Sequence, residues 1–143
     1  MSKLRYGTKR EAIDALVADA SLPEVKTRKQ AEQYLQAHIP AEKVWQGRIR
    51  EKIREMFPSC FVWKAAQGSY SQGGLPDLCA VIGGRFFGFE IKRPYFGRPT
   101  KLQLQTIKRI QDAGGQAYVV CWPEEVEELL RPIWEEARQN EKT

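Results

Sequence analysis

The sequence predicts an α/β domain in which a mixed β-sheet is flanked by helices. Two observations lead to this fold class. First, Gly83-Gly84 separates two segments of strand-like composition, which is a strong signal for a two-residue β-hairpin. Second, a helix and then a further strand follow the hairpin, and this succession is typical of a mixed sheet with helices packed on it. The 143 residues are 42% hydrophobic and 29% charged, as in an ordinary globular domain.

Helices are predicted where a capping residue precedes apolar residues at three-to-four spacing. The strongest pattern is Trp45, Ile49 and Ile53, which places a helix over residues 41–57. We expect the other helices to begin after Thr8, after Thr27 with Gln30 in a capping box, after Thr100, and at Pro123 with a break at Pro132.

Strands are predicted from runs of aromatic and β-branched residues bounded by turn residues, over 60–66, 77–82, 85–92 and 116–122. The core order is therefore α-β-β-β-α-β-α, and we expect Trp45, Phe57 and Trp63 to lie inside it. Along the chain, we divide the sequence into a helical N-terminal extension (1–39), the core (40–130) and an acidic C-terminal helix or tail (131–143).

The charge is uneven along the chain. The formal net charge is +5, but residues 1–122 carry +9 and residues 123–143 carry −4. A basic body favours a polyanionic partner, with nucleic acid as the first candidate. No apolar run approaches the roughly 18 residues of a membrane-spanning helix, so no membrane association is expected. The cysteines, at 60, 79 and 121, form no CxxC pair, and this pattern fits a reducing, cytoplasmic compartment.

The hairpin fixes which side chains face each other. A turn centred on Gly83-Gly84 pairs residue 82 with 85 and, by the same count, Asp77 with Glu90. Directly opposed residues point to the same face, and strand alternation adds Lys92 to it. Two opposed carboxylates repel each other unless a shared proton, a basic neighbour or a cation offsets the repulsion. Oxygen ligands beside a basic surface suit Mg²⁺ or Mn²⁺.

A simpler interpretation of these residues is also open. Asp77 then serves as a turn residue after Pro76, while Glu90 and Lys92 form an exposed, solvated face of the hairpin.

Pro76-Asp77 followed by Glu90-Ile91-Lys92 resembles the signature of the PD-(D/E)XK nuclease superfamily. A wider set of residues is similar to the virus-type replication-repair nuclease (VRR-NUC) domain, over about residues 41–128. This set comprises Gly74-Leu75-Pro76-Asp77-Leu78, Gly84-Arg85-Phe86-Phe87-Gly88-Phe89-Glu90-Ile91-Lys92-Arg93-Pro94, Gln103, Ala113-Gly114-Gly115 and Val119-Val120. The resemblance implies a restriction-endonuclease-like core and metal-dependent phosphodiester hydrolysis.

The resemblance also implies roles for single residues. Asp77, Glu90 and the main-chain carbonyl of Ile91 are expected to be ligands of Mg²⁺ or Mn²⁺. Lys92 is expected to position or activate the attacking water.

Two further positions match the family. Glu42 matches a glutamate early in the first core helix and is expected to add a metal ligand or a water contact, with Glu51 as its rival. An ordinary acidic residue in a helix's first turn would explain Glu42 equally well. Gln103 matches a glutamine of the helix that follows the catalytic strand, and is expected to contact Lys92 or the substrate; a solvated polar residue is the alternative.

Residues that could contact DNA lie on both sides of the Asp77 and Glu90 strands. Before them lie Lys64, Ser69, Tyr70 and Gln72, residue types that commonly bind the phosphate backbone, although a solvated loop is the alternative. After them come Arg93, Arg98 and Lys101, which we expect at the rim that faces DNA.

The sequence thus predicts a metal-dependent DNA endonuclease, specific for branched, junction or flap DNA, in replication, repair or recombination. Its setting would be the cytoplasm of a bacterium or of a phage-infected host cell. A homodimer is expected because cutting both strands of DNA needs two active sites. The alternatives are a basic module that binds nucleic acid without cutting it, and a protein-interaction role for the extension and the acidic tail.

Overall fold

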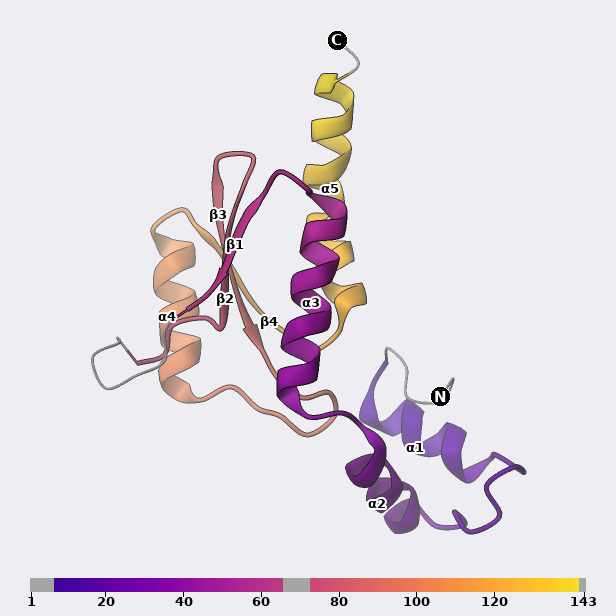
Figure 1. The fold of residues 1–143 in the computed structure, drawn as a ribbon. Helices are drawn as coiled ribbons and strands as arrows, with labels where there is room; N and C mark the ends of the chain where they lie inside the picture. Colours follow the sequence, from indigo (N-terminus) through magenta and orange to yellow (C-terminus); the bar gives the residue numbers. More distant parts are fainter. Residues whose placement is uncertain (1–6, 66–72, 142–143) are drawn as a thin grey trace.

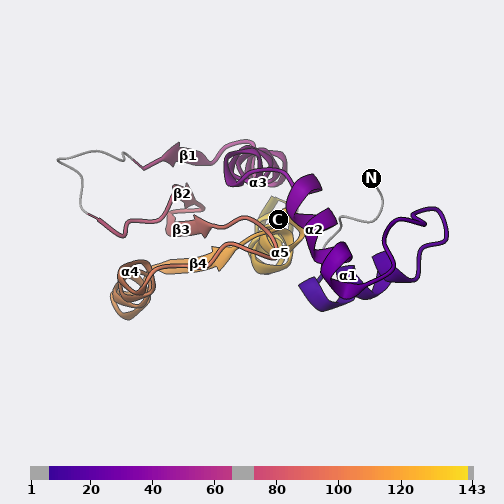
Figure 2. The same ribbon diagram turned by 90° about the horizontal axis from the view of Figure 1, so that it is seen from below.

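The chain forms one four-stranded sheet in the order β1-β2-β3-β4, with helices on both sides (Figures 1 and 2). The structure is a computed structural model and describes residues 7–65 and 73–141. The predicted α/β class and the core order are confirmed, and the arrangement is consistent with a restriction-endonuclease-like core. The elements are α1 (Lys9–Val17), α2 (Arg28–His38), α3 (Glu42–Met56), β1 (Phe61–Lys64), β2 (Leu78–Ile82), β3 (Arg85–Ile91), α4 (Lys101–Asp112), β4 (Gln116–Val120) and α5 (Pro123–Glu141).

The central hairpin has the predicted register. Leu78 pairs with Phe89 and Ile82 with Arg85 in antiparallel strands. Gly83 and Gly84 both have positive φ, at 57° and 78°, a conformation that glycine adopts without steric cost in tight hairpins. β1 pairs antiparallel with β2, and β4 pairs parallel with β3.

The main hydrophobic core lies between one face of the sheet and helices α3 and α5. Trp45, Ile49 and Ile53 of α3 pack there, together with Val126 and Leu130 of α5. The strands contribute their alternate residues Val62, Leu78, Ala80, Ile82, Phe87, Phe89, Ile91 and Val120. Helix α4 packs against β4 on the opposite side of the sheet (Figure 2).

The prediction that Trp63 belongs to this core is wrong. Val62 pairs with Ala80 and shares its buried face, so Trp63 one residue later points to the other face of the sheet. Trp45 is 3% exposed, as expected, and Phe57 packs at the edge of the core.

The last helix does not break at Pro132. Helix α5 runs through this proline, so the division that we drew at residues 130 and 131 falls inside one continuous helix. A proline inside a helix costs about 3 kcal/mol because it removes a hydrogen bond and crowds the preceding turn. Leu130 is fully buried and Leu129 and Ile133 pack against the core, and this burial offsets the cost.

The N-terminal extension forms a small helical unit. Thr8 caps α1 and Thr27 forms a capping box with Gln30 at the start of α2, as predicted. Leu16 and Leu35 are fully buried between the two helices. Tyr95, with Phe96, packs against both this cluster and the main core, so the loop after β3 joins the extension to the sheet.

Within residues 7–65 and 73–141, no helix combines the length and the apolar content needed to cross a membrane. The three cysteines are free thiols.

Candidate active site

Asp77 is the residue immediately before β2, and close backbone packing places it there. Pro76 packs on Gly88 of β3. A β-carbon at position 88 would lie 2.9 Å from Pro76 Cγ, so this close packing needs a glycine there. The Asp77 carbonyl accepts a hydrogen bond from Ala65 N (2.9 Å), which continues the pairing of β1 with β2. Asp77 Oδ2 accepts a hydrogen bond from Ile91 N (2.8 Å), so the carboxylate is fixed against β3, next to Glu90.

Glu90 is a buried carboxyl group. Only 1% of it is exposed, so the simpler interpretation, in which it lies on a solvated face, is wrong. Its Oε1 accepts hydrogen bonds from Gln103 Nε2 (2.8 Å) and Lys92 Nζ (3.2 Å). Its Oε2 is buried and has no hydrogen-bond partner. A buried oxygen without a hydrogen-bond partner destabilises the fold, and binding of a proton or a cation to this oxygen would remove that cost.

The electrostatics of the pair agree with this geometry. Burial, and after it the charge of Asp77, raise the pKa of Glu90 to about 7, although Lys92 acts in the opposite direction. Near neutral pH, Glu90 is therefore poised between its protonated and ionised forms.

Gln103 is held in place by the start of α4. Its Oε1 accepts a hydrogen bond from Thr100 N (2.8 Å), and its own N donates to Thr100 Oγ1 (3.1 Å), which completes a capping box. This arrangement leaves the side-chain NH₂ to donate to Glu90. Gln103 therefore contacts the carboxylate, whereas Lys92 or the substrate was the expected partner.

Lys92 follows β3 directly and continues its pairing with β4. Its backbone N donates to Val120 O (3.0 Å), and its side chain is 12% exposed. The position places Lys92 on the same face as Glu90, as the strand alternation predicted.

The pair fits a hard divalent cation. Asp77 and Glu90 supply two carboxylates, and the unpaired Glu90 Oε2 is an oxygen of the kind that Mg²⁺ and Mn²⁺ prefer. In the described part of the chain, no three His, Cys, Asp or Glu side chains form a metal-holding cluster. Two carboxylates are nevertheless a common protein contribution to a Mg²⁺ site, because water and substrate phosphate complete the coordination.

Glu42 begins α3 and lies near the site without joining the carboxylate pair. Burial, together with the charges of Glu125 and Glu42, raises the pKa of the Cys121 thiol to about 11, and Arg98 and Lys92 oppose this rise. Glu42 and Lys92 are thus both within electrostatic range of Cys121. The rival Glu51 is exposed and lies 3.7 Å from Arg54, further along the helix. The roles of Glu42 and of the Ile91 carbonyl as ligands stay predictions.

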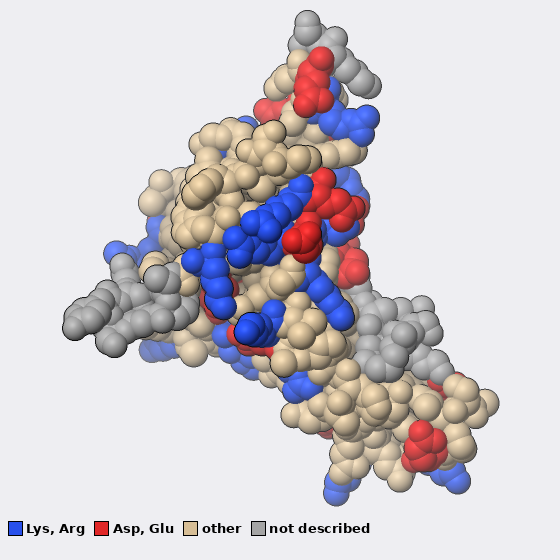
Figure 3. Space-filling model, in the orientation of Figure 1, with Lys and Arg blue, Asp and Glu red and all other residues tan. Residues whose placement is uncertain are grey.

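Several of the expected DNA-contacting cations are exposed. Lys64 is the last residue of β1 and pairs with Leu78. Arg98 lies in the loop before α4, and Lys101 is the first residue of α4. Figure 3 shows basic side chains gathered over α3 and beside the end of β1. The other three candidates, Ser69, Tyr70 and Gln72, lie outside the described residues.

Arg93 has a different position from the expected DNA-facing rim. Its guanidinium donates to the carbonyl oxygens of Gln36 (2.7 Å), Ile39 (3.0 Å) and Pro40 (3.4 Å) and lies over the ring of Phe96. These carbonyls at the end of α2 have no partner within that helix, and a guanidinium is well suited to several at once. Arg93 thus ties the N-terminal extension to the strand that carries Glu90.

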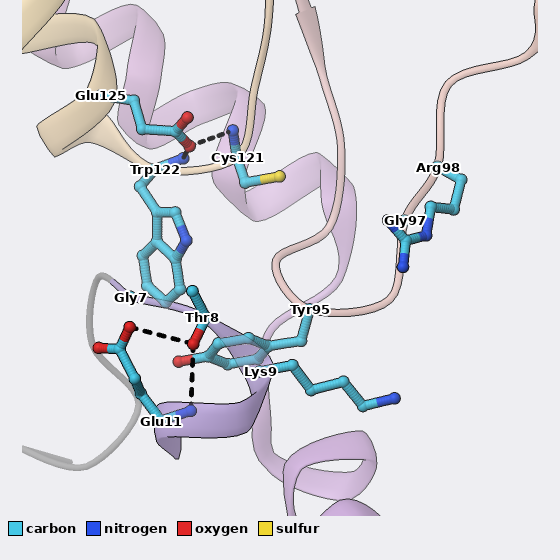
Figure 4. Close-up of a pocket in the computed structure, with 10 residues that line it drawn as sticks. All are labelled: Gly7, Thr8, Lys9, Glu11, Tyr95, Gly97, Arg98, Cys121, Trp122 and Glu125. Atoms are coloured by element: carbon cyan, nitrogen blue, oxygen red, sulfur yellow. Dashed lines mark hydrogen bonds between the residues drawn. The ribbon is translucent and has the colours of Figure 1, made fainter. Parts of the chain in front are cut away.

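A cavity of about 590 Å³ lies between the start of α1, the turn after β3 and the end of β4 (Figure 4). Its lining includes Arg98 and Cys121 but neither Asp77 nor Glu90. Two of its charged groups are engaged: Glu125 accepts from the backbone N of Cys121 and Trp122, and Lys9 pairs with Glu32. This cavity is a neighbour of the carboxylate site and not part of it.

Among solved structures, the chain is similar to a VRR_NUC domain, with 26% sequence identity and a TM-score of 0.49 over 59% of this chain and 92% of that chain. This is the family that the sequence motifs resemble. No family model matches the chain, and no curated protein matches it.

Sequence reasoning missed two features around the site. One is the use of Arg93 inside the protein, which depends on a contact with residues more than 50 positions away. The other is Trp63, whose place on the same sheet face as Asp77 follows from extending the hairpin register by one strand.

The substitution Asp77→Asn is expected to raise the melting temperature of the metal-free protein at pH 8 by a few degrees. It removes the repulsion with ionised Glu90, while the amide oxygen of asparagine can still accept from Ile91 N. Adding Mn²⁺ should stabilise the wild type by mass action and the variant much less. Differential scanning fluorimetry with EDTA or Mn²⁺ measures both effects, and equal Mn²⁺ gains in the two proteins would contradict the site.

The metal-free protein is also expected to lose stability between about pH 5 and pH 8. The pKa of Glu90 is higher in the folded protein than its ordinary value of 4.5, so its stabilising contribution is complete below pH 4.5 and is lost as the pH rises through about 7. The loss is at most about 3 kcal/mol. Urea unfolding in EDTA at several pH values, compared with Glu90→Gln, isolates the effect. A pH profile that is identical in the two proteins would show that Glu90 does not titrate in this way.

Proposed function

We propose that this chain is a Mg²⁺- or Mn²⁺-dependent deoxyribonuclease that hydrolyses phosphodiester bonds within branched, junction or flap DNA. The observation that supports the proposal most directly is the buried Glu90, with one unpaired oxygen, beside Asp77 and 3.2 Å from Lys92. A buried glutamate with a raised pKa, next to a second carboxylate and a lysine, is the kind of arrangement that marks functional sites.

The carboxylates and the lysine have separate roles in this proposal. Asp77, Glu90 and the Ile91 carbonyl would hold the cation, with Glu42 as a further ligand or water contact. When bound, the cation supplies stabilisation of the negative charge on phosphate and lowers the pKa of coordinated water. Gln103 fixes the orientation of Glu90 through a 2.8 Å hydrogen bond to Oε1, which would leave Oε2 for the cation.

Lys92 can act on the substrate while it keeps its contact with Glu90. An ammonium group has three donors, and one of them reaches Glu90 Oε1. The others are free to orient a water or to donate to a phosphate oxygen on which charge develops. Preorganised donors of this kind are worth roughly 10²–10³-fold in rate.

DNA as the substrate is supported by the charge distribution. Residues 1–122 carry a net charge of +9, and the exposed Lys64, Arg98 and Lys101 flank the ends of the strands that carry the site. Contacts to phosphates set the position of a protein on DNA. A homodimer is part of the proposal, because two active sites are needed to cut both strands.

The test is a cleavage panel with the purified chain on four-way junction, flap and linear duplex DNA, with Mg²⁺, with Mn²⁺ or with EDTA. We expect metal-dependent cleavage of the branched substrates. Lys92→Ala is expected to lower the rate by about 10²–10³-fold. Lys29→Ala, which removes an exposed lysine of α2, is the matched control and should cleave like the wild type.

Circular dichroism establishes that each variant is folded before rates are compared. DNA binding with steep salt dependence and without cleavage under any condition would overturn the proposal in favour of a non-catalytic binding module. Sedimentation of the same samples decides whether the chain is a dimer.

A further inference from the structure

Aromatic side chains occupy the sheet face that carries Asp77 and Glu90. Phe61 of β1 pairs with Val81, which in turn pairs with Phe86 of β3. Two residues further along β1, toward Asp77, Trp63 pairs with Cys79. Because alternate residues of a strand share a face, these residues and Asp77 all point to the side of the sheet opposite the core.

The aromatic side chains form a row that is open to solvent at its outer end. We define the aromatic row as Phe61, Trp63 and Phe86. The ring centroids of Phe61 and Trp63 are 5.3 Å apart, and those of Trp63 and Phe86 are 6.4 Å apart. Phe61 is 67% exposed and its neighbour Val81 is 41% exposed. On this face of the sheet, helix α4 packs against β4, which is the edge strand farthest from β1 (Figure 2).

The aromatic row leads to the candidate active site. Phe86 lies next to Gly88. Pro76, the residue before Asp77, packs against Gly88 in the space that a β-carbon would occupy. Phe86 also lines a cavity of about 630 Å³ together with Gly114 and Gly115. A cavity of this volume is within the usual range for small-molecule ligands.

The charges around the aromatic row suit a polyanion. Within β1, β2 and β3, the sole acidic residue is Glu90, which is buried. Lys64 ends β1. Burial raises the pKa of Cys60, and the charge of Arg54 opposes this rise, which places Arg54 near the other end of the strand. In Figure 3, both basic and acidic side chains border the largely uncharged surface over the hairpin end of the sheet, with the basic ones beside β1.

We infer that the aromatic row binds unpaired nucleobases of single-stranded DNA by stacking, beside the candidate active site. The inference rests on the proposed function for the identity of the polymer. Rings on an open sheet with cations at the margins are the recurrent solution for single-stranded nucleic acids, because every base has a face that can stack. The site would give the protein a preference for DNA with a single-stranded segment next to the bond that is cut.

A second copy of the chain is a less suitable occupant of this surface. Pairing of β1 with β1 of another copy about a two-fold axis would bring the Lys64 end of one strand against the Arg54 end of the other. Like charges would then meet at both ends of the contact.

The test measures DNA binding without cleavage. Fluorescence anisotropy in EDTA compares a labelled oligothymidylate of about 20 nucleotides with a duplex of the same length at one salt concentration. Phe61→Leu keeps an apolar side chain but removes the ring, and we expect it to weaken single-strand binding at least about fivefold while duplex binding changes less than about twofold. Phe61→Tyr should bind both DNAs like the wild type.

Two controls separate stacking from other effects. Val44→Ala trims a 44% exposed apolar residue on α3 and should leave both affinities unchanged. An oligonucleotide of abasic sites keeps the phosphates, so the wild type should bind it as weakly as Phe61→Leu binds oligothymidylate.

Some outcomes would overturn the inference. Unchanged single-strand binding by Phe61→Leu, or equal weakening on single strands and duplex, would show that the ring does not stack on bases. A change in sedimentation mass with unchanged single-strand binding would assign the aromatic row to contact between copies. These measurements need no catalysis. They can therefore contradict the binding of single-stranded DNA by the aromatic row without contradicting the proposed nuclease activity, and the cleavage panel tests that activity separately.

Discussion

The repulsion between Asp77 and Glu90 is the constraint on which the site depends. The hairpin register and the hydrogen bond from Ile91 N bring the two carboxyl groups together, and burial leaves one oxygen of Glu90 without a partner. A fold optimised for stability alone would place an apolar residue at position 90, since removing both partners of a buried polar contact is often neutral or stabilising. In the proposed function, a cation bound between the two carboxylates would relieve this repulsion, and the relief would favour its binding.

The surrounding residues reduce the repulsion between the two carboxyl groups but do not remove it. Lys92 and Gln103 both donate to the same oxygen, Oε1, and so leave Oε2 for another partner. Arg93, the next residue along, is bound to carbonyls at the end of α2 and links β3 to the N-terminal extension. The extension is thus joined to the end of β3, and on the sheet face opposite the main core the outer end of the aromatic row, Phe61, is 67% exposed.

The sequence predicted the parts of the structure that depend on local rules. Gly83-Gly84 fixed the register, and with it the meeting of Asp77 and Glu90, because the side-chain period of a strand is two. Capping residues located the starts of α1, α2 and α4. What failed depends on tertiary packing: Pro132 stays helical because its neighbours are buried, and Trp63 leaves the core because β1 takes its register from β2.

Nuclear magnetic resonance with Mn²⁺ tests most directly whether Asp77 and Glu90 bind a cation. Paramagnetic Mn²⁺ added at substoichiometric amounts at pH 8 should first broaden the backbone amide of Ile91 and the side-chain amide of Gln103, which donate to Asp77 and Glu90. The same signals should stay sharp in Glu90→Gln. If these two amides stayed sharp in the wild type while signals elsewhere broadened, the carboxylate pair would not be a cation site.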